Sequence, residues 1–192
     1  QVAWNWLAGG TASSNTDGTI TSTVSASTTS GFSVVTYSGS NSNSSVGHGL
    51  GVAPKMIIIK RRTGTGAWLV GNSNIGWTKR IYLHATDAAG TYNNFQDTAP
   101  SSSVFTLTGN LVDSCQSGSD YVAYCFAEKK GFSKFGSYTG NGSTDGTFVY
   151  TGFKPAYFVI KRTDTTENWY CTDNKRDPAN PVDGNLLLLN KT

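Results

Sequence analysis

One pattern of residues occurs twice in this chain, about a hundred residues apart, and it limits the folds that the chain can adopt. The first copy reads APKMIIIKRRTGTGAW at 53–68, and the second reads KPAYFVIKRTDTTENW at 154–169. Four anchor residues keep one offset of 101: Pro54 with Pro155, Lys60 with Lys161, Arg61 with Arg162, and Trp68 with Trp169. An apolar run between a Pro and a short polar turn is typical of a buried strand that leads into a hairpin. We therefore expect the chain to build the same hairpin twice.

The likeness extends beyond the hairpin and divides the chain into units. GFSVVTYSGS at 31–40 matches GFSKFGSYTGN at 131–141, and VAWNW at 2–6 resembles VAYCF at 122–126. RIYLHAT and SSVFTLTG supply further strands between these points. We expect three segments: the last strand of a preceding repeat plus a Ser/Thr-rich hairpin arm turning at TDGT (1–30), a complete repeat (31–130), and the first half of a second, truncated repeat (131–192).

A unit that stops halfway would leave strand edges exposed, which proteins avoid. We therefore expect the sequence to be a window of a longer repeat protein. The alternative is a swap in which a neighbouring chain supplies the missing strands.

Period-two alternation of apolar and polar residues marks most of the expected strands. It is present in VAWNW, TITSTVSAS, FSVVTYS, VFTLTG, YVAYCFA and FVYTGF, with Gly, Asn and Ser in the turns between them. A unit of about 100 residues is too long for a propeller blade or a β-helix rung. We expect an all-β fold, an antiparallel β-sandwich of the jelly-roll or concanavalin/lectin-like kind, in tandem repeats of that length.

Composition excludes several classes of protein. Charged residues make up 14% of the 192, and the net charge of +3 comes from scattered pairs, so the electrostatic footprint of a nucleic-acid binder is weak. Three cysteines without CxxC spacing and two histidines give no metal-site pattern. No apolar run is long enough to span a membrane, and no signal peptide is seen. We expect no metal, no cofactor, no nucleic acid and no membrane span.

The sequence has two candidate binding regions. The repeated Lys-Arg/Trp pattern suits an anionic glycan, because Trp stacks on sugars and Arg pairs with carboxylates, but a repeated spacing favours a role in the scaffold. The loops after the hairpins differ, as NSNIGWTKR at 72–80 and DNKRDPANPVDG at 173–184, and recognition commonly lies in such loops. The predicted ligand-binding residues are Trp77, Lys79, Arg80, Asp173, Lys175, Arg176 and Asp177.

The sequence has no motif of a catalytic site. His48 lies in the Gly-rich VGHGLG, and His84 lies in RIYLHAT, with no GxSxG or HExxH motif beside either one. We favour structural roles for both, with His48 capped by backbone groups. Most carboxylates lie in turn contexts, and a glycosidase would need two that face each other. We expect no catalytic residues.

Several stretches together resemble a known family. WNWLAGG, NTDGTITSTVSA, GHGLGVAPKMIIIKRR, YVAYCFAE and GFSKFGSYTGNGSTDG look like a repeated β-sandwich domain of virion proteins of marine tailed phages, of the tail-fibre-like kind. The resemblance covers nearly the whole chain. It implies tandem sandwiches in a phage appendage or on a capsid surface, commonly as homotrimers. The family has no agreed binding or catalytic residues, so none is carried over.

These observations lead to an expected function. We expect a non-enzymatic virion structural protein, a fibre or surface-decoration segment located on the extracellular virion, with host-surface glycan binding as a further activity of its loops. Its partners would be copies of itself, with a trimer favoured, other virion proteins, and host-surface polysaccharide. The alternative is a secreted or cell-surface bacterial carbohydrate-binding or adhesive repeat protein. A glycan-cleaving enzyme is the third candidate.

Overall fold

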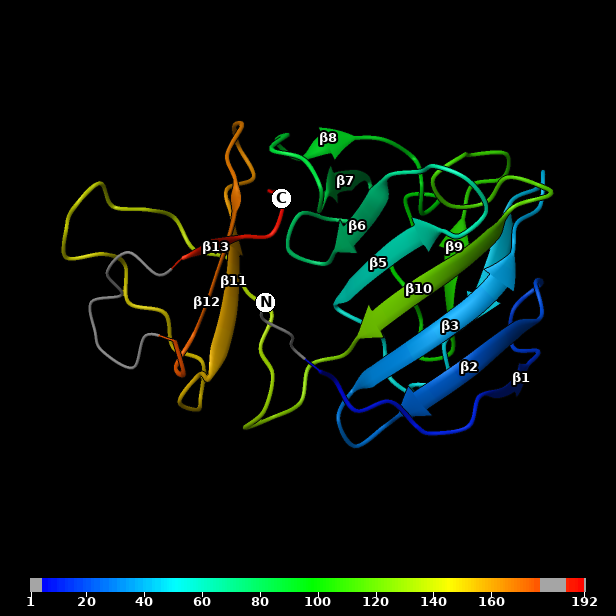
Figure 1. The fold of residues 1–192 in the computed structure, drawn as a ribbon, viewed down its shortest axis with the longest axis horizontal. Coiled ribbons are helices and arrows are strands. Elements are labelled where there is room, and N and C mark those ends of the chain that lie inside the picture. Colours follow the sequence, from blue (N-terminus) through cyan, green and yellow to red (C-terminus); the bar gives the residue numbers. More distant parts are fainter. Residues whose placement is uncertain (1–4, 177–185, 192) are drawn as a thin grey trace.

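The structure, a computed structural model, describes residues 5–176 and 186–191, and all regular secondary structure in them is β (Figure 1). The strands are β1 Ser13–Asn15, β2 Ser22–Ser27, β3 Phe32–Ser38, β4 Ser44–Gly47, β5 Met56–Arg61, β6 Trp68–Asn72, β7 Lys79–Tyr82, β8 Gly90–Thr91, β9 Val104–Leu107, β10 Asp120–Phe126, β11 Tyr157–Lys161, β12 Trp169–Asp173 and β13 Leu187–Leu188. Neighbouring strands pair antiparallel throughout. The all-β, antiparallel part of the prediction is therefore confirmed.

Three sheets contain these strands. The large sheet has eight, in the order β1-β2-β3-β10-β5-β6-β7-β8; the small sheet is β4-β9; and the C-terminal sheet is β11-β12-β13. The hairpin predicted around TDGT is present, with Ser13 opposite Val24 and Asn15 opposite Ser22. Since β2 also pairs with β3, this hairpin forms one edge of the large sheet. No helix of the described residues is long and apolar enough to cross a membrane.

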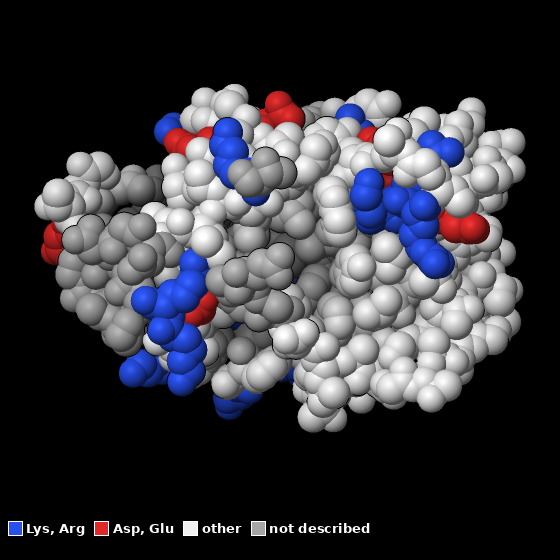
Figure 2. Space-filling view, viewed as in Figure 1, with Lys and Arg blue, Asp and Glu red and all other residues white. Residues whose placement is uncertain are grey.

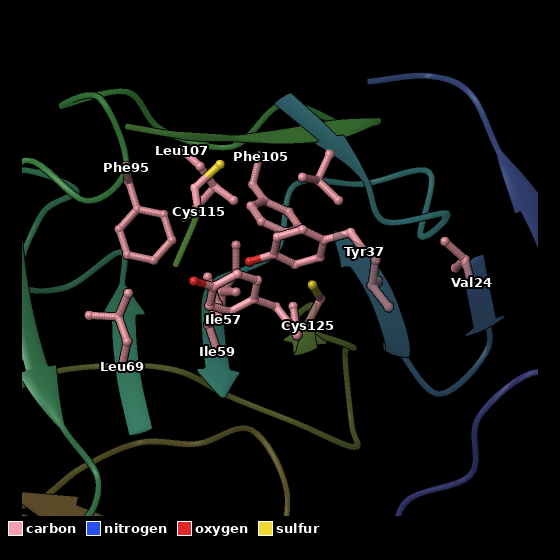
Figure 3. Close-up of a cluster of buried hydrophobic side chains, with 14 of the residues drawn as sticks. Val24, Tyr37, Ile57, Ile59, Leu69, Phe95, Phe105, Leu107, Cys115 and Cys125 are labelled. Carbon is pink, nitrogen blue, oxygen red and sulfur yellow. The ribbon is translucent and has the colours of Figure 1, made fainter. Parts of the chain in front are cut away.

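The main core lies between the large and small sheets. The alternation in β10 directs Tyr121, Ala123 and Cys125 inward, where each is fully buried, and Phe105 and Leu107 of β9 meet them from the other side. Figure 3 shows these two β9 side chains in one cluster with the large-sheet side chains. We call the opposite face of the large sheet its outer face.

The C-terminal sheet repeats the strand pairing of β5, β6 and β7. In both hairpins the paired residues correspond at an offset of 101, with Met56↔Asn72 and Lys60↔Trp68 in β5-β6 and Tyr157↔Asp173 and Lys161↔Trp169 in β11-β12. The third strands also correspond, with Val70↔Ile81 in one sheet and Cys171↔Leu187 in the other. The hairpin predicted from the repeated sequence pattern is thus present at both places.

Hydrogen bonds around the two hairpins correspond as well. The Trp68 amide donates to His84 Nδ1 at 3.3 Å, and the Trp169 amide donates to Asn190 Oδ1 at 2.9 Å. After the third strand, Leu83 N donates to Trp68 O and Leu189 N to Trp169 O, both at 3.0 Å. His84 therefore has a structural role, as expected, because Asn190 accepts the equivalent hydrogen bond in the other hairpin.

The C-terminal sheet packs on the outer face of the large sheet. Trp169, 6% exposed, lies in a cluster with Val70 and Ile81, and its Nε1–H donates to Tyr82 O at 2.9 Å. Backbone bonds from Ala89 N to Thr163 O (2.9 Å) and from Glu167 N to Thr86 O (2.8 Å) join the β11-β12 turn to the loop between β7 and β8. Trp169 thus serves the scaffold, which is the role that the repeated spacing favours.

One predicted strand is wrong and another lies mostly outside the described residues. FVYTGF at 148–153 forms no strand, and Phe148 and Tyr150 are 86% and 78% exposed. GFSKFGS at 131–137, which matches the start of the complete unit in sequence, forms no strand either. In the complete unit β3 is held between β2 and β10. No described strand stands beside the second GFS, so alternation alone does not order it. Of VAWNW, only Asn5 and Trp6 are described.

Candidate functional site

The best-supported polar site is a cleft of about 160 Å³ beside β7 and β8. We call it the Arg80 cleft; its walls include Arg80, Tyr82, Asp87, Thr91 and Tyr92. The Arg80 guanidinium carbon lies 3.7 Å from the Tyr92 ring centroid and 4.7 Å from that of Tyr82. Tyr92 is 46% exposed. The cleft therefore combines a cation, a carboxylate, a hydroxyl and an accessible aromatic ring.

Buried polar residues hold the walls of this cleft in place. Arg80 Nη1 donates to Asn94 Oδ1 at 3.0 Å, and Asn94 is fully buried and bonded in turn to Ser114 Oγ at 3.3 Å. Tyr82 Oη donates to Asp113 Oδ2 at 3.2 Å. Burial, with the Asp113 carboxylate adding to it, raises the pKa of Tyr82 to about 12, so the phenol stays protonated at neutral pH. Asn94 binds one of the five N–H donors of the Arg80 guanidinium, and this hydrogen bond orients the guanidinium plane.

The two loops predicted to bind ligand are placed differently. Arg80 and Lys79 lie on β7, Lys79 exposed and Arg80 in the cleft, whereas Trp77 is 8% exposed and packs edge-on against Phe95 at 5.2 Å between centroids. The Trp77 ring therefore belongs to the core and is left out of the site. The sequence around Trp77, Trp-x-Lys-Arg, has the pattern of a loop, but the indole packs in the space above Gly71.

The second loop forms a separate ion-paired turn. Asp173 Oδ2 lies 2.8 Å from Arg176 Nε, and Asp173 Oδ1 accepts from the amides of Lys175 and Arg176, both at 3.0 Å. The Arg176 guanidinium and these amides lower the pKa of Asp173 to about 2. The carboxylate thus caps its own turn. Asp177 lies outside the described residues.

A second concavity lies on the C-terminal sheet. We call it the apolar trough; it has a volume of about 360 Å³ and is lined by Tyr138, Phe158, Ile160, Arg162, Glu167, Tyr170 and Leu186. Phe158 and Leu186 are 40% and 44% exposed. At the positions equivalent to Phe158 and Ile160, Ile57 and Ile59 are fully buried under the small sheet. The trough is therefore the face that corresponds to a core face.

The remaining candidates have structural surroundings. His48 is fully buried, with Nδ1 accepting from the Leu50 amide at 3.2 Å and Nε2 at 3.3 Å from Ser101 O. Burial lowers the pKa of His48, which keeps the imidazole neutral. The capping role expected of His48 is confirmed. Lys60 lies 5.8 Å from the Trp68 ring centroid and bonds to Gly66 O at its own turn. Among the described residues no group of three His, Cys, Asp or Glu is placed to hold a metal.

Sequence reasoning missed most of the Arg80 cleft. Tyr92 and Asp87 lie in ATDAAGTYNN, which carries no periodicity or motif. Only the pairing of β8 with β7, Arg80 opposite Gly90, brings them beside Arg80. The exposed charge on the face shown in Figure 2 falls in separate small groups on a mostly uncharged surface, which does not resemble the continuous basic stripe of a nucleic-acid binder.

Comparison with known proteins gives one match. No curated protein and no solved structure matches the chain. One protein family, described as "Domain of unknown function (DUF7483)", matches residues 1–192. The chain therefore belongs to the DUF7483 family, which spans its whole length.

Proposed function

We propose that this chain is a non-enzymatic structural segment of a tailed-phage virion, a fibre or surface-decoration module built from tandem β-sandwich repeats. The observation that carries the proposal is the second hairpin: β11-β12-β13 has the strand pairing of β5-β6-β7, displaced by 101 residues in its first two strands. Repeated units of this kind build long appendages, because each unit buries its apolar faces against a neighbour.

The packing of the sheets supports the sandwich part of the proposal. The small sheet faces the large sheet across a continuous apolar core, which is the arrangement of two packed layers. The C-terminal sheet has the equivalents of β5, β6 and β7, but an open trough in place of the covered core. In a tandem array, a further repeat or another copy of the chain covers that trough. Homo-oligomers, with a trimer favoured, are the assembly that we propose.

Host-surface glycan binding is the activity that we propose for the Arg80 cleft. An exposed aromatic ring beside an oriented guanidinium suits a sugar that carries a carboxylate, since the ring stacks on the sugar face and the fork pairs with the acid. Thr91 and Asp87 add hydrogen-bonding groups for hydroxyls. Thus the ligand class is an acidic polysaccharide of the host surface.

The binding proposal is tested by titrating the protein with oligosaccharides that contain uronic acid. Arg80→Lys and Tyr92→Ala are each expected to weaken binding by roughly tenfold or more, because each removes a directional contact. Lys79→Ala is the matched control, a neighbouring exposed cation outside the cleft. A loss for Lys79→Ala with none for Arg80→Lys, which keeps the positive charge, would show nonspecific charge attraction and would reject the site.

The alternative is an adhesive repeat protein of a bacterial surface, and the same fold and cleft suit that setting. Location separates the two proposals. An antibody raised against the purified protein should label purified virus particles if the virion proposal is right, and washed bacterial cells if the alternative is right. Release of reducing ends from the bound polysaccharide would reject the non-enzymatic reading in either setting.

A further inference from the structure

The loop that leads from β7 to β8 forms one wall of the Arg80 cleft. Asp87 and Ala88 of this loop line the cleft, together with Gly90 and Thr91 of β8. β8 is the last strand of the large sheet and pairs with β7 alone. The large sheet therefore supports this wall from one side only, and contacts with other parts of the chain help to set its position.

Those contacts come from the β11-β12 turn of the C-terminal sheet. Ala89 N donates to Thr163 O at 2.9 Å, and Glu167 N donates to Thr86 O at 2.8 Å. The two cleft residues of the loop lie between Thr86 and Ala89, so these bonds hold the wall at both of its ends. Figure 1 shows the β11-β12 turn beside the loop that precedes β8.

Lys161, at the end of β11, adds a charged contact to the same loop. Its ammonium donates to Thr86 O at 3.3 Å. Burial lowers the pKa of Lys161, and the Glu167 and Asp87 carboxylates act in the opposite direction, so the ammonium is within electrostatic range of the cleft. A ligand carboxylate that approaches Arg80 also approaches Asp87, and a cation beside Asp87 offsets the repulsion between the two acids.

The two hairpins use their equivalent lysines differently. Lys60, the counterpart of Lys161, bonds to Gly66 O in its own turn, whereas Lys161 reaches the loop of the other unit. The strand ladders also place Leu186 at the position of Arg80, so the second hairpin does not repeat the arginine of the cleft. The cleft therefore belongs to the first unit, and the second unit supplies contacts that hold its wall.

We propose that docking of the C-terminal sheet on the large sheet shapes the Arg80 cleft, and that Lys161 is a positioning residue, which holds the cleft wall and offsets its negative charge. This inference rests on the sugar binding proposed above for the cleft. If docking strengthens sugar binding, the bound sugar must strengthen docking by the same factor. The binding site thus lies at the junction of two successive units, and a unit without a docked successor binds the sugar weakly.

Titration of the full chain with oligosaccharides that contain uronic acid tests the effect on binding. Lys161→Met removes the ammonium and keeps the length of the side chain, and it should weaken binding by about fivefold or more. This loss should be smaller at high salt, where charges are screened. Lys60→Met is the matched control, the same change in the equivalent hairpin, and should leave the affinity unchanged.

Trp169→Ala tests the docking of the sheet as a whole. This change removes a buried contact between the C-terminal sheet and the large sheet, so it should also weaken sugar binding. Cys171, two residues further along β12, is fully buried. Because coupling is reciprocal, saturating sugar should slow the reaction of Cys171 with a thiol reagent in this variant.

A measurement without sugar separates this inference from the binding proposal. The side-chain NMR signals of Arg80 and Tyr92 report the shape of the cleft, and they should shift in Lys161→Met and Trp169→Ala but not in Lys60→Met. Unchanged signals in the first two variants, or equal losses of affinity in the two lysine variants, would overturn the inference. A loss that salt does not reduce would make Lys161 a structural residue only.

Failure of the unaltered chain to bind any of these sugars would reject the binding proposal instead. The NMR signals alone would then decide whether docking shapes the cleft.

Discussion

Replacing Trp169 with Ala should separate the C-terminal sheet from the large sheet. The indole is 6% exposed, packs on Val70 and Ile81, and donates to Tyr82 O at 2.9 Å. Truncating a buried Trp to Ala costs about 3 to 5 kcal/mol, and the lost hydrogen bond is part of that sum. The equivalent change at Trp68 should cost about 1 to 2 kcal/mol, because that ring is half-buried and stacks on Tyr124.

The three cysteines allow this loss to be located. Cys171 is buried in the C-terminal sheet, whereas Cys115 and Cys125 are buried in the main core. In Trp169→Ala, a thiol reagent should label Cys171 more than about a hundredfold faster, since every 1.4 kcal/mol changes the open population tenfold. Labelling of Cys125 should stay slow, because burial raises the pKa of that thiol to about 12.

Two outcomes would refute this reasoning. Equal acceleration at Cys171 and Cys125 would mean that Trp169 supports the whole fold rather than one contact between sheets. Equal effects of Trp169→Ala and Trp68→Ala would mean that the two equivalent rings have the same surroundings, contrary to their different burial.

Two further predictions concern the main core. Gly71→Ala should lower the free energy of unfolding by about 1 to 3 kcal/mol, because a Cβ there would lie 2.5 Å from Phe95 Cε2 and 2.8 Å from Trp77 Cζ3. Urea denaturation measures this loss of stability. Thr172→Ala, at the equivalent position of the C-terminal sheet, should change the free energy of unfolding much less. Burial lowers the pKa of His48 in the folded chain. Below about pH 6.5 the unfolded chain therefore binds a proton at this histidine more readily than the folded chain does, and the free energy of unfolding should fall as the pH drops. His48→Gln should flatten that pH dependence, and an unchanged slope in this variant would assign it to other groups.

The repeated hairpin shows what the sequence was able to predict. The apolar runs of β5 and β11 lie between a Pro and a polar turn, and this local chemistry is enough to form the same strand pairs in both places. Two-residue alternation likewise located β2, β3, β9 and β10. It failed at Phe148 and Tyr150, because a strand also needs neighbours that supply its hydrogen bonds.

The candidate site was harder to predict for a different reason. Arg80 was identified from a divergent loop, but Tyr92 and Asn94 reach it only through the β7-β8 pairing and a buried amide network. Trp77 was predicted to bind ligand but lies in the core, because an exposed and a buried tryptophan in a loop have the same sequence pattern. Contacts that depend on tertiary packing leave no local pattern to read.

Electron microscopy of the protein in its native assembly tests the central claim most directly. The expected result is a virion appendage or surface layer in which copies of this chain surround an axis, β11-β13 keep the pairing of β5-β7, and the apolar trough is covered by a neighbouring repeat or copy. A closed, solitary monomer with two facing carboxylates in a wet cleft would contradict it and would favour a glycan-cleaving enzyme.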